Sequence, residues 1–203
     1  MQPFKKIVAL AAPLDRTNVD TDQIIPKQFL KRIERTGYGE FLFFDWRRTA
    51  SGDPNPDFVL NEPRYSAAQI LIAGKNFGCG SSREHAAWAL SDFGFRCVIA
   101  PTFADIFFSN AGKNGILLVK LSEDQVNQLL ENAKTIANYQ LTVSLEDRTV
   151  TDNRNFNGTF EIDPFRRFCL LEGLDDIGLA LRHEAALDKF ESAHDNALWL
   201  RAK

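Results

Sequence analysis

The sequence predicts an α/β protein with a parallel core sheet and added β-hairpins. Between residues 67 and 121, apolar runs alternate with helical stretches, which is typical of parallel βαβ units. After Asn138, short segments alternate apolar and polar residues, which is typical of antiparallel strands. The chain has 203 residues, 44% of them hydrophobic, which is enough for one sizeable core, so we expect a single domain over residues 1–203.

The first part of the chain predicts few regular elements. Residues 7–12 predict a strand, residues 18–22 a polar loop and residues 26–35 a short helix. Residues 37–63 are punctuated by Gly and Pro, so we expect a partly irregular loop region. Its aromatic side chains are expected to pack either against the core of this chain or against a partner; they are Phe41, Phe43, Phe44 and Trp46.

The middle of the chain predicts a continuous βα alternation. The expected elements are a strand at 67–73, a helix at 82–92, a strand at 95–100, a helix near 104–112, a strand at 115–121 and a helix that begins at Ser122. Ser122 and Gln125 have the spacing of a capping box, which marks a helix start and indicates no chemistry.

The last part predicts hairpins followed by helices. Residues 141–145 and 148–151 alternate as strands do, and Asn157-Gly158 is a strong hairpin signal. Two helices are expected after Pro164. One ends near Gly173, and the other runs from Leu174 to about Phe190. Residues 191–203 are expected to form a weakly ordered tail, in which Trp199 and Leu200 are the residues suited to docking.

Composition excludes several classes of protein. The net charge of −3 is unlike the basic footprint of a nucleic-acid-binding protein. No apolar run has the length of a membrane span, and the N-terminus lacks the apolar region of a signal peptide. The three cysteines, Cys79, Cys97 and Cys169, are odd in number and widely spaced, which indicates neither a disulfide framework nor a zinc motif. We expect a cytoplasmic protein that binds no nucleic acid, no membrane and no metal of its own.

The most informative stretch is Gly78-Cys79-Gly80-Ser81-Ser82-Arg83-Glu84-His85, between an expected strand and an expected helix. A glycine-rich turn before a helix directs backbone N–H groups at a ligand, and the Arg83 fork matches a carboxylate. Alternatively, Ser81 and Glu84 form a capping box that only starts the helix. The residues leave a carboxylate site and a simple helix cap both open.

Cys79 lies beside this stretch. It is either an activated nucleophile or a small residue that fits a tight turn. We favour the second interpretation, because no His or Asp at useful spacing marks Cys79 as activated.

Two segments, Asn76 to His85 and Asn18 to Pro26, resemble the two signatures of the swivelling domain of the aconitase superfamily. Residues 101–107 and 114–117 match the same family, so the resemblance covers nearly the whole chain. It is strongest to the family of small subunits of 3-isopropylmalate dehydratase. The resemblance implies the swivelling β/β/α domain as the fold.

The resemblance also implies roles for residues. Ser81 matches the catalytic base of the family, and Ser82 and Arg83 match residues that bind the substrate carboxylate, with Gly80 beside them. Asp22 matches an aspartate that orients or relays protons. Thr21 is expected to contribute a hydroxyl to the substrate and Asp20 to support the site. The alternative is that Asp20-Thr21-Asp22 only caps a loop or the following helix.

Further residues around these motifs receive weaker assignments. Lys31, Arg32 and Arg35 are typical of a solvated helix face, but the family places its substrate-discriminating loop here, so Lys31 is expected to contact substrate. Glu84 and His85 are expected to be supporting residues. His183 and His194 have no motif around them and are expected to be structural.

The resemblance implies a hydro-lyase that interconverts 2-isopropylmalate and 3-isopropylmalate through 2-isopropylmaleate in leucine biosynthesis. A lone cysteine near the site does not hold an iron–sulfur cluster, so the [4Fe–4S] cluster of the family is expected on a large-subunit partner, with a small hydroxy-dicarboxylate as substrate. Two alternatives stay open. One is the small subunit of a related dehydratase acting on citraconate/2-methylmalate or homoaconitate, and the other is a non-catalytic dicarboxylate-binding regulatory module.

Overall fold

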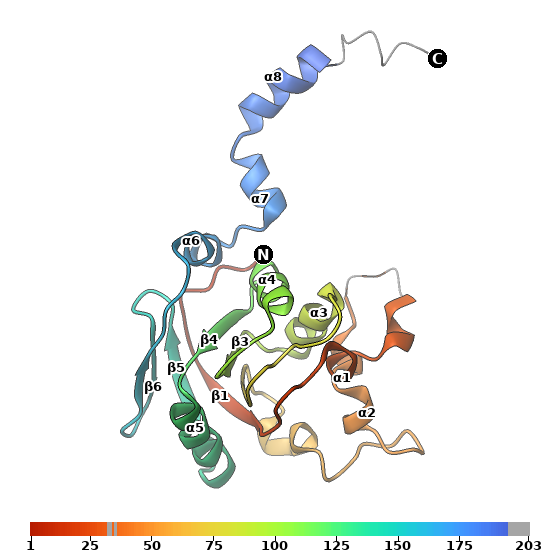
Figure 1. Ribbon diagram of the computed structural model, residues 1–203, viewed down its shortest axis with the longest axis vertical. Coiled ribbons are helices and arrows are strands. Elements are labelled where there is room, and N and C mark those ends of the chain that lie inside the picture. Colours follow the sequence, from red (N-terminus) through yellow and green to blue (C-terminus); the bar gives the residue numbers. More distant parts are fainter. Residues whose placement is uncertain (32–33, 35, 195–203) are drawn as a thin grey trace.

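A computed structural model describes residues 1–31, 34 and 36–194, and these residues build one seven-stranded mixed sheet (Figure 1). Its order is β4-β3-β2-β1-β5-β6-β7. The strands are β1 (Lys6–Leu14), β2 (Ile70–Ala73), β3 (Cys97–Ala100), β4 (Leu117–Lys120), β5 (Gln140–Ser144), β6 (Thr149–Asp152) and β7 (Asn157–Thr159).

The helices lie on both faces and at one end of this sheet (Figure 1). The α-helices are α1 (Thr21–Ile24), α2 (Phe44–Arg47), α3 (Glu84–Phe93), α4 (Asp105–Lys113), α5 (Glu123–Thr135), α6 (Pro164–Glu172), α7 (Asp176–Leu181) and α8 (Glu184–His194). The described residues also form short 3₁₀ helices, which are η1 (Lys27–Lys31), η2 (Gly39–Phe41), η3 (Val59–Asn61) and η4 (Pro63–Tyr65).

Strand β1 joins the parallel and antiparallel halves of the sheet. Its first half pairs antiparallel with β5, where Ile7 faces Val143. Its second half pairs parallel with β2, where Ala11 faces Ile70. The predicted parallel core with added hairpins is therefore confirmed, and the two parts form one continuous sheet.

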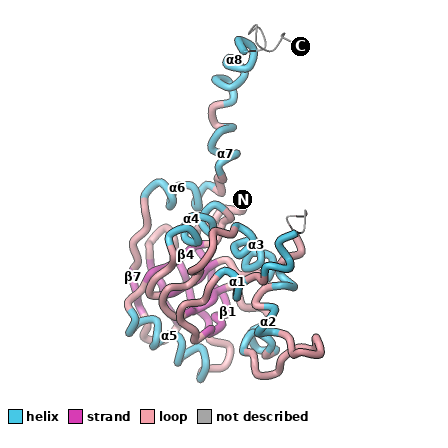
Figure 2. The backbone as a smooth tube through the Cα atoms, turned by 45° about the vertical axis from the view of Figure 1, so that its right-hand side comes forward, coloured by secondary structure: helices cyan, strands magenta, loops and turns pink. Residues whose placement is uncertain are grey.

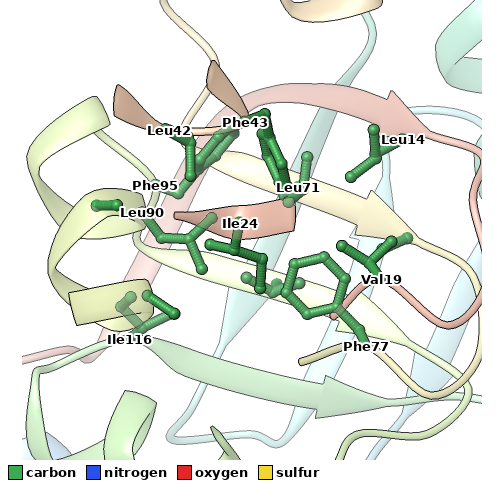
Figure 3. Packing of buried hydrophobic residues seen from close by; sticks show 14 of the residues in the cluster. Leu14, Val19, Ile24, Leu42, Phe43, Leu71, Phe77, Leu90, Phe95 and Ile116 are labelled. Atoms are coloured by element: carbon green, nitrogen blue, oxygen red, sulfur yellow. The ribbon is translucent and has the colours of Figure 1, made fainter. Parts of the chain in front are cut away.

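Both faces of the parallel half are buried, because side chains alternate between the faces along each strand. Leu71 and Ala73 of β2 belong to the core cluster under α1 to α4, whereas Ile70 and Ile72 belong to the cluster under α5. Figure 3 shows the first cluster, in which Val19 and Phe77 from the loops and Ile24 from α1 pack on the sheet. This packing ties the loops at one sheet edge to the core.

The aromatic residues of segment 37–63 pack within this chain. Phe43 is fully buried, and its ring stacks on Trp46 with the centroids 5.5 Å apart. Phe41 and Phe44 are partly buried and contact Phe29. Of the two alternatives, packing within this chain or against a partner, packing within this chain is the one observed. Within the segment, the short helical turns η2, α2 and η3 are separated by loops.

The predicted hairpin turn at Asn157-Gly158 is wrong. Both residues lie within β7 and pair with β6. The turn lies earlier, where the Asp152 carboxylate accepts hydrogen bonds from the amides of Arg154 and Phe156 at 2.8 and 2.9 Å. An Asp side chain that folds back on the next amides makes such a turn without Asn-Gly.

The long helix predicted over 174–190 is in fact two helices. Asp175 caps α7, and the helix ends at Arg182 before α8 begins at Glu184. Figure 2 shows α7 and α8 leaving the body as an arm beyond α6. Residues 191–194 of the expected tail belong to α8, and Trp199 and Leu200 lie outside the described residues. No helix within the described ranges is long and apolar enough to cross a membrane.

The other elements differ from expectation mainly at their ends. Strand β2 begins three residues later than predicted, and the helix expected at 26–35 is the 3₁₀ helix η1, with residues 32, 33 and 35 outside the described part. The capping box at Ser122 is confirmed: its hydroxyl accepts from the Gln125 amide at 3.3 Å, and α5 follows.

Candidate active site

Three loops meet where parallel strands β1, β2 and β3 end. The Asn18 amide donates to the Lys75 carbonyl at 2.9 Å, which joins the loops after β1 and β2. The Phe77 amide donates to the Thr102 carbonyl at 3.1 Å, which joins the loops after β2 and β3. The carboxyl edge of a parallel sheet is where α/β proteins place their ligands, so both sequence motifs lie in a position suited to a site.

The backbone joins the two motifs directly. The Gly78 amide donates to the Val19 carbonyl at 2.7 Å, and the Thr21 amide donates to the Cys79 carbonyl at 2.8 Å. Asp20 and Cys79 form a parallel bridge between these hydrogen bonds. Residues 18–22 and 78–81, which lie about 60 positions apart in the sequence, therefore form one local structure.

Glycine is required in the turn after β2. Gly78 has a φ of +77°, and a Cβ there would lie 2.2 Å from the Phe107 ring. Gly80 has a φ of +91°, which an L side chain rarely adopts. The turn thus passes closely over α4 and presents its next residues, Ser81 and Ser82, to solvent.

Asp20 caps a helix that begins inside the expected loop at 18–22. Its carboxylate accepts from the Gln23 amide at 2.8 Å, and the Gln23 side chain accepts from the Asp20 amide at 3.0 Å. This capping box starts α1 at Thr21. The prediction of a loop over residues 18–22 is therefore wrong at its end, because residues 21 and 22 are helical. For Asp20, the alternative that it caps the following helix is observed.

Ser81, by contrast, caps no helix. The residue at the N-cap of α3 is Arg83, in an extended conformation and without a side-chain cap. The capping-box interpretation of Ser81 and Glu84 is therefore wrong. Ser81 and Ser82 are exposed, and neither hydroxyl has a hydrogen-bond partner among the described residues. Both hydroxyls are available to a ligand.

Arg83 forms an ion pair with Asp22, and this contact brings the charged groups of the two motifs together. The Arg83 side chain is only 10% exposed. Lys27 adds a second cation, with its Nζ 3.4 Å from the Asp22 carboxylate. Burial acts to raise the pKa of Asp22, but the hydrogen bond and charge of Arg83, together with Lys27, outweigh burial, and the pKa lies below its ordinary value.

Thr21 is one of the few buried polar residues, at 2% exposure. Its hydroxyl donates to the Ser81 carbonyl at 2.9 Å. The hydroxyl proton is therefore used within the protein, and Thr21 contacts the loop that carries Ser81.

The start of α3 rests on an aromatic cluster. The His85 ring lies 5.3 Å from Tyr38 and 4.7 Å from Trp88 between centroids. Burial holds the pKa of His85 below its ordinary value, so its ring is neutral at neutral pH. This environment agrees with a packed supporting residue.

Asn114 contacts two residues of α3 and was not among the predicted site residues, although residues 114–117 belong to the family resemblance. Its side chain accepts from the Trp88 indole N–H at 3.0 Å and donates to the Glu84 carboxylate at 3.3 Å. The sequence feature that could have identified Asn114 is its position directly before Gly115, in the turn between a helix and a strand.

The cysteines do not form a metal or nucleophile site within the described chain. Burial, followed by the charge of Asp20, raises the pKa of Cys79, which opposes thiolate formation. Cys97 and Cys169 are buried in the core. No three His, Cys, Asp or Glu side chains gather at one point in the described part of the chain, so this donor set does not fit a [4Fe–4S] cluster.

The remaining candidates lie away from these contacts or outside the described residues. Lys31 is exposed at the end of η1. Arg32 and Arg35 lie outside the described residues. His194 stacks on Phe190 in α8, with the ring centroids 4.8 Å apart.

Family models match most of the chain. Residues 1–124 match the aconitase C-terminal domain, and residues 127–164 match the family described as LeuD_N. Two relatives carry the name 3-isopropylmalate dehydratase small subunit. One, from Acidobacterium capsulatum, is 68% identical, over 98% of this chain and 94% of the relative. The other, from Brevibacillus brevis, is 57% identical, over 95% of this chain and 99% of the relative.

A solved structure has the same fold. The crystal structure of 3-isopropylmalate dehydratase (leuD) from Methanocaldococcus jannaschii superposes with a TM-score of 0.66 at 24% identity. The match covers 91% of this chain and 98% of that one. The shared fold extends over nearly all of both chains.

Proposed function

The chain belongs to the family of 3-isopropylmalate dehydratase small subunits, and from this premise we propose that it is one half of a hydro-lyase of leucine biosynthesis. The enzyme interconverts 2-isopropylmalate and 3-isopropylmalate through 2-isopropylmaleate. The observation that carries the proposal is the joining of the two motifs at one sheet edge, with exposed Ser81 and Ser82 beside the Arg83–Asp22 pair.

Arg83 binds a carboxylate of the substrate in this proposal. A guanidinium fork matches a carboxylate in two parallel hydrogen bonds, and Arg83 is oriented by Asp22 from one side. Ser82 adds its hydroxyl, and the open turn at Gly80 permits close approach. A substrate that carries two carboxylates supplies the negative charge that this cation binds.

Ser81 is the proposed base that takes the proton from the carbon next to a carboxylate. A serine hydroxyl acts as a base only where a positive field lowers its pKa. In the chain alone, Asp22 compensates much of the charge of Arg83. The field at Ser81 must therefore strengthen when the site is completed, which assigns part of the electrostatics to the partner.

Asp22 has two proposed tasks. It holds the Arg83 fork in the direction of the substrate, and as a carboxylate that is ionised at neutral pH it accepts or relays a proton at the edge of the site. Its partial exposure leaves it reachable from outside the chain, where groups of the partner would lie.

The partner is the large subunit. We assign the [4Fe–4S] cluster of this enzyme class to that subunit, because the described residues of this chain do not gather ligands for it. When bound, the cluster supplies the Lewis acidity for hydroxide departure. The small subunit contributes Arg83 as the cation that binds a carboxylate and Ser81 as the base.

Co-expression with the large subunit of the same organism tests the proposal. The two chains are expected to co-purify, and the complex handled without oxygen is expected to convert 2-isopropylmalate to 3-isopropylmalate. Citramalate and homocitrate, run in parallel, compare related hydroxy diacids. A complex that turned over one of these faster than isopropylmalate, or that turned over none, would contradict the proposed substrate.

A further inference from the structure

Thr21 holds the turn around Gly80 from both sides. Its amide donates to the carbonyl of Cys79 at 2.8 Å, before the glycine. Its hydroxyl donates to the carbonyl of Ser81 at 2.9 Å, after the glycine. A Cβ on Gly80 would lie 3.4 Å from the Thr21 hydroxyl oxygen, so the two segments are in close contact. One residue thus fixes two peptide planes of a turn whose central glycine is otherwise conformationally free.

The second hydrogen bond determines where the Ser82 amide points. The peptide bond between Ser81 and Ser82 is trans and planar, so its N–H is antiparallel to its C=O. Because the carbonyl points at buried Thr21, the Ser82 N–H points away from Thr21. This N–H has no acceptor among the described residues. It is therefore a free donor beside two exposed hydroxyls, as a developing carboxylate anion requires.

Thr21 has no room to contact a substrate itself. It is 2% exposed, and its hydroxyl proton is engaged by Ser81. This geometry differs from the expectation that its hydroxyl binds substrate. Because Thr21 is buried and its hydroxyl donates to the turn, any effect of this residue on the reaction passes through that turn.

We propose that Thr21 is a positioning residue for the reaction: its hydroxyl fixes the Ser81–Ser82 peptide so that the Ser82 N–H and the Ser81 side chain face the substrate. The inference rests on the proposed function, in which Ser81 is the base. A small displacement of a catalytic group costs up to about 100-fold in rate. The loss of this one hydrogen bond should therefore lower kcat more than it affects substrate binding.

The test compares Thr21→Val, which keeps the shape and removes the hydroxyl, with Thr21→Ser, which keeps the hydroxyl. Both are assembled with the large subunit and measured per assembled complex. Thr21→Val should lower kcat by about 10-fold or more and change KM by less than about threefold, whereas Thr21→Ser should stay within about threefold of wild type. Thr21→Ala serves as a second hydroxyl-free variant.

Hydrogen exchange of the isolated small subunit gives a readout that needs no activity. The amides of Thr21, Gly78 and Cys79, which hydrogen-bond between the two segments, should exchange about 10-fold faster in Thr21→Val than in Thr21→Ser. Equal kcat and equal exchange in the Val and Ser variants would overturn the inference. It would also fail if neither hydroxyl-free variant assembled while Thr21→Ser did, because the hydroxyl would then serve the fold.

Ser81→Ala, measured in the same series, separates this inference from the proposed function. If Ser81→Ala keeps the wild-type kcat, the assignment of the base is wrong and the positioning role falls with it. If Ser81→Ala loses kcat while Thr21→Val keeps it, the base stands and only the role of Thr21 is overturned.

Discussion

The guanidinium of Arg83 forms an ion pair with the carboxylate of Asp22, 61 positions earlier in the chain. The contact joins the charged residues of two motifs that the backbone already holds side by side. Asp22 directs the fork of Arg83 and compensates its charge. The two motifs are therefore organised within the chain itself, with the charge of Arg83 compensated by Asp22.

Replacing Arg83 by Lys should reduce kcat/KM by about 10- to 150-fold, because Lys keeps the charge and loses the planar fork. This range corresponds to about 1.5–3 kcal/mol for a hydrogen bond to a charged group. Steady-state kinetics of the assembled enzyme measure the effect. Arg148→Lys is the control: the Arg148 side chain pairs with exposed Glu161 at 3.3 Å, and this variant should leave the kinetics unchanged. Equal kinetics for both variants would remove Arg83 from substrate binding.

Replacing Ser81 by Ala should lower kcat by about 100-fold or more, as expected for loss of a general base. Because Ser81 is exposed and caps no helix, the free energy of unfolding should change by less than about 0.5 kcal/mol. Ser122→Ala is the matched control: it removes a true N-cap, should cost about 1 kcal/mol of stability and should leave kcat unchanged. A Ser81→Ala enzyme with wild-type kcat would show that Ser81 is no base.

The chain purified alone should not turn over any hydroxy diacid, because the described residues provide no Lewis acid ligands. Adding the large subunit should bring turnover to about 1 per second or more. Titration of one subunit with the other, with rate as the readout, measures the dependence. Turnover by the small subunit alone at that rate would contradict the two-subunit enzyme.

Asp22 should make stability depend on pH in the acid range. Its pKa in the folded chain lies below its ordinary value, so ionised Asp22 stabilises the fold above about pH 4, the pKa of an unfolded Asp. That contribution is lost as pH falls through the lower, folded pKa. Wild type should therefore be more stable than Asp22→Asn at pH 7, and the difference should shrink towards pH 3. Denaturant unfolding at both pH values measures it, and a constant difference would mean that the carboxylate charge plays no part.

Residues 37–63 should be equally protected from hydrogen exchange with and without the large subunit. Phe43 is fully buried in the core of this chain. The Asn61 side chain donates to the carbonyls of Arg47 and Asn55, both at 2.8 Å, and so closes the loop on itself. Protection that rises strongly on binding would place this segment at the interface instead. The edge that carries Asp20, Asp22 and Ser81 is the face expected to gain protection.

Local sequence patterns were enough to predict the class of the fold and to single out the two motifs that the structure joins. The alternation of strands and helices between 67 and 121 follows from side-chain periodicity, a local property, and the structure agrees with it closely. The glycine-rich turn before Ser81 stood out from its residues, whereas residues 18–26 were recognisable from their resemblance to a signature of the aconitase superfamily. The start of α5 at Ser122 was predictable because a capping box involves only four residues.

The tertiary structure decided what local signals left open. Ser81 and Asp20 both have the spacing of a cap, yet only Asp20 caps a helix, because Thr21 binds the carbonyls around Gly80 and holds Ser81 away from α3. The burial of Phe43, the pairing of Asn157-Gly158 within β7 and the Arg83–Asp22 ion pair likewise depend on partners far along the chain. Contacts of this kind form only when the folded sheet brings loops that are distant in the sequence to one edge. A local sequence pattern does not show which distant residues will become neighbours.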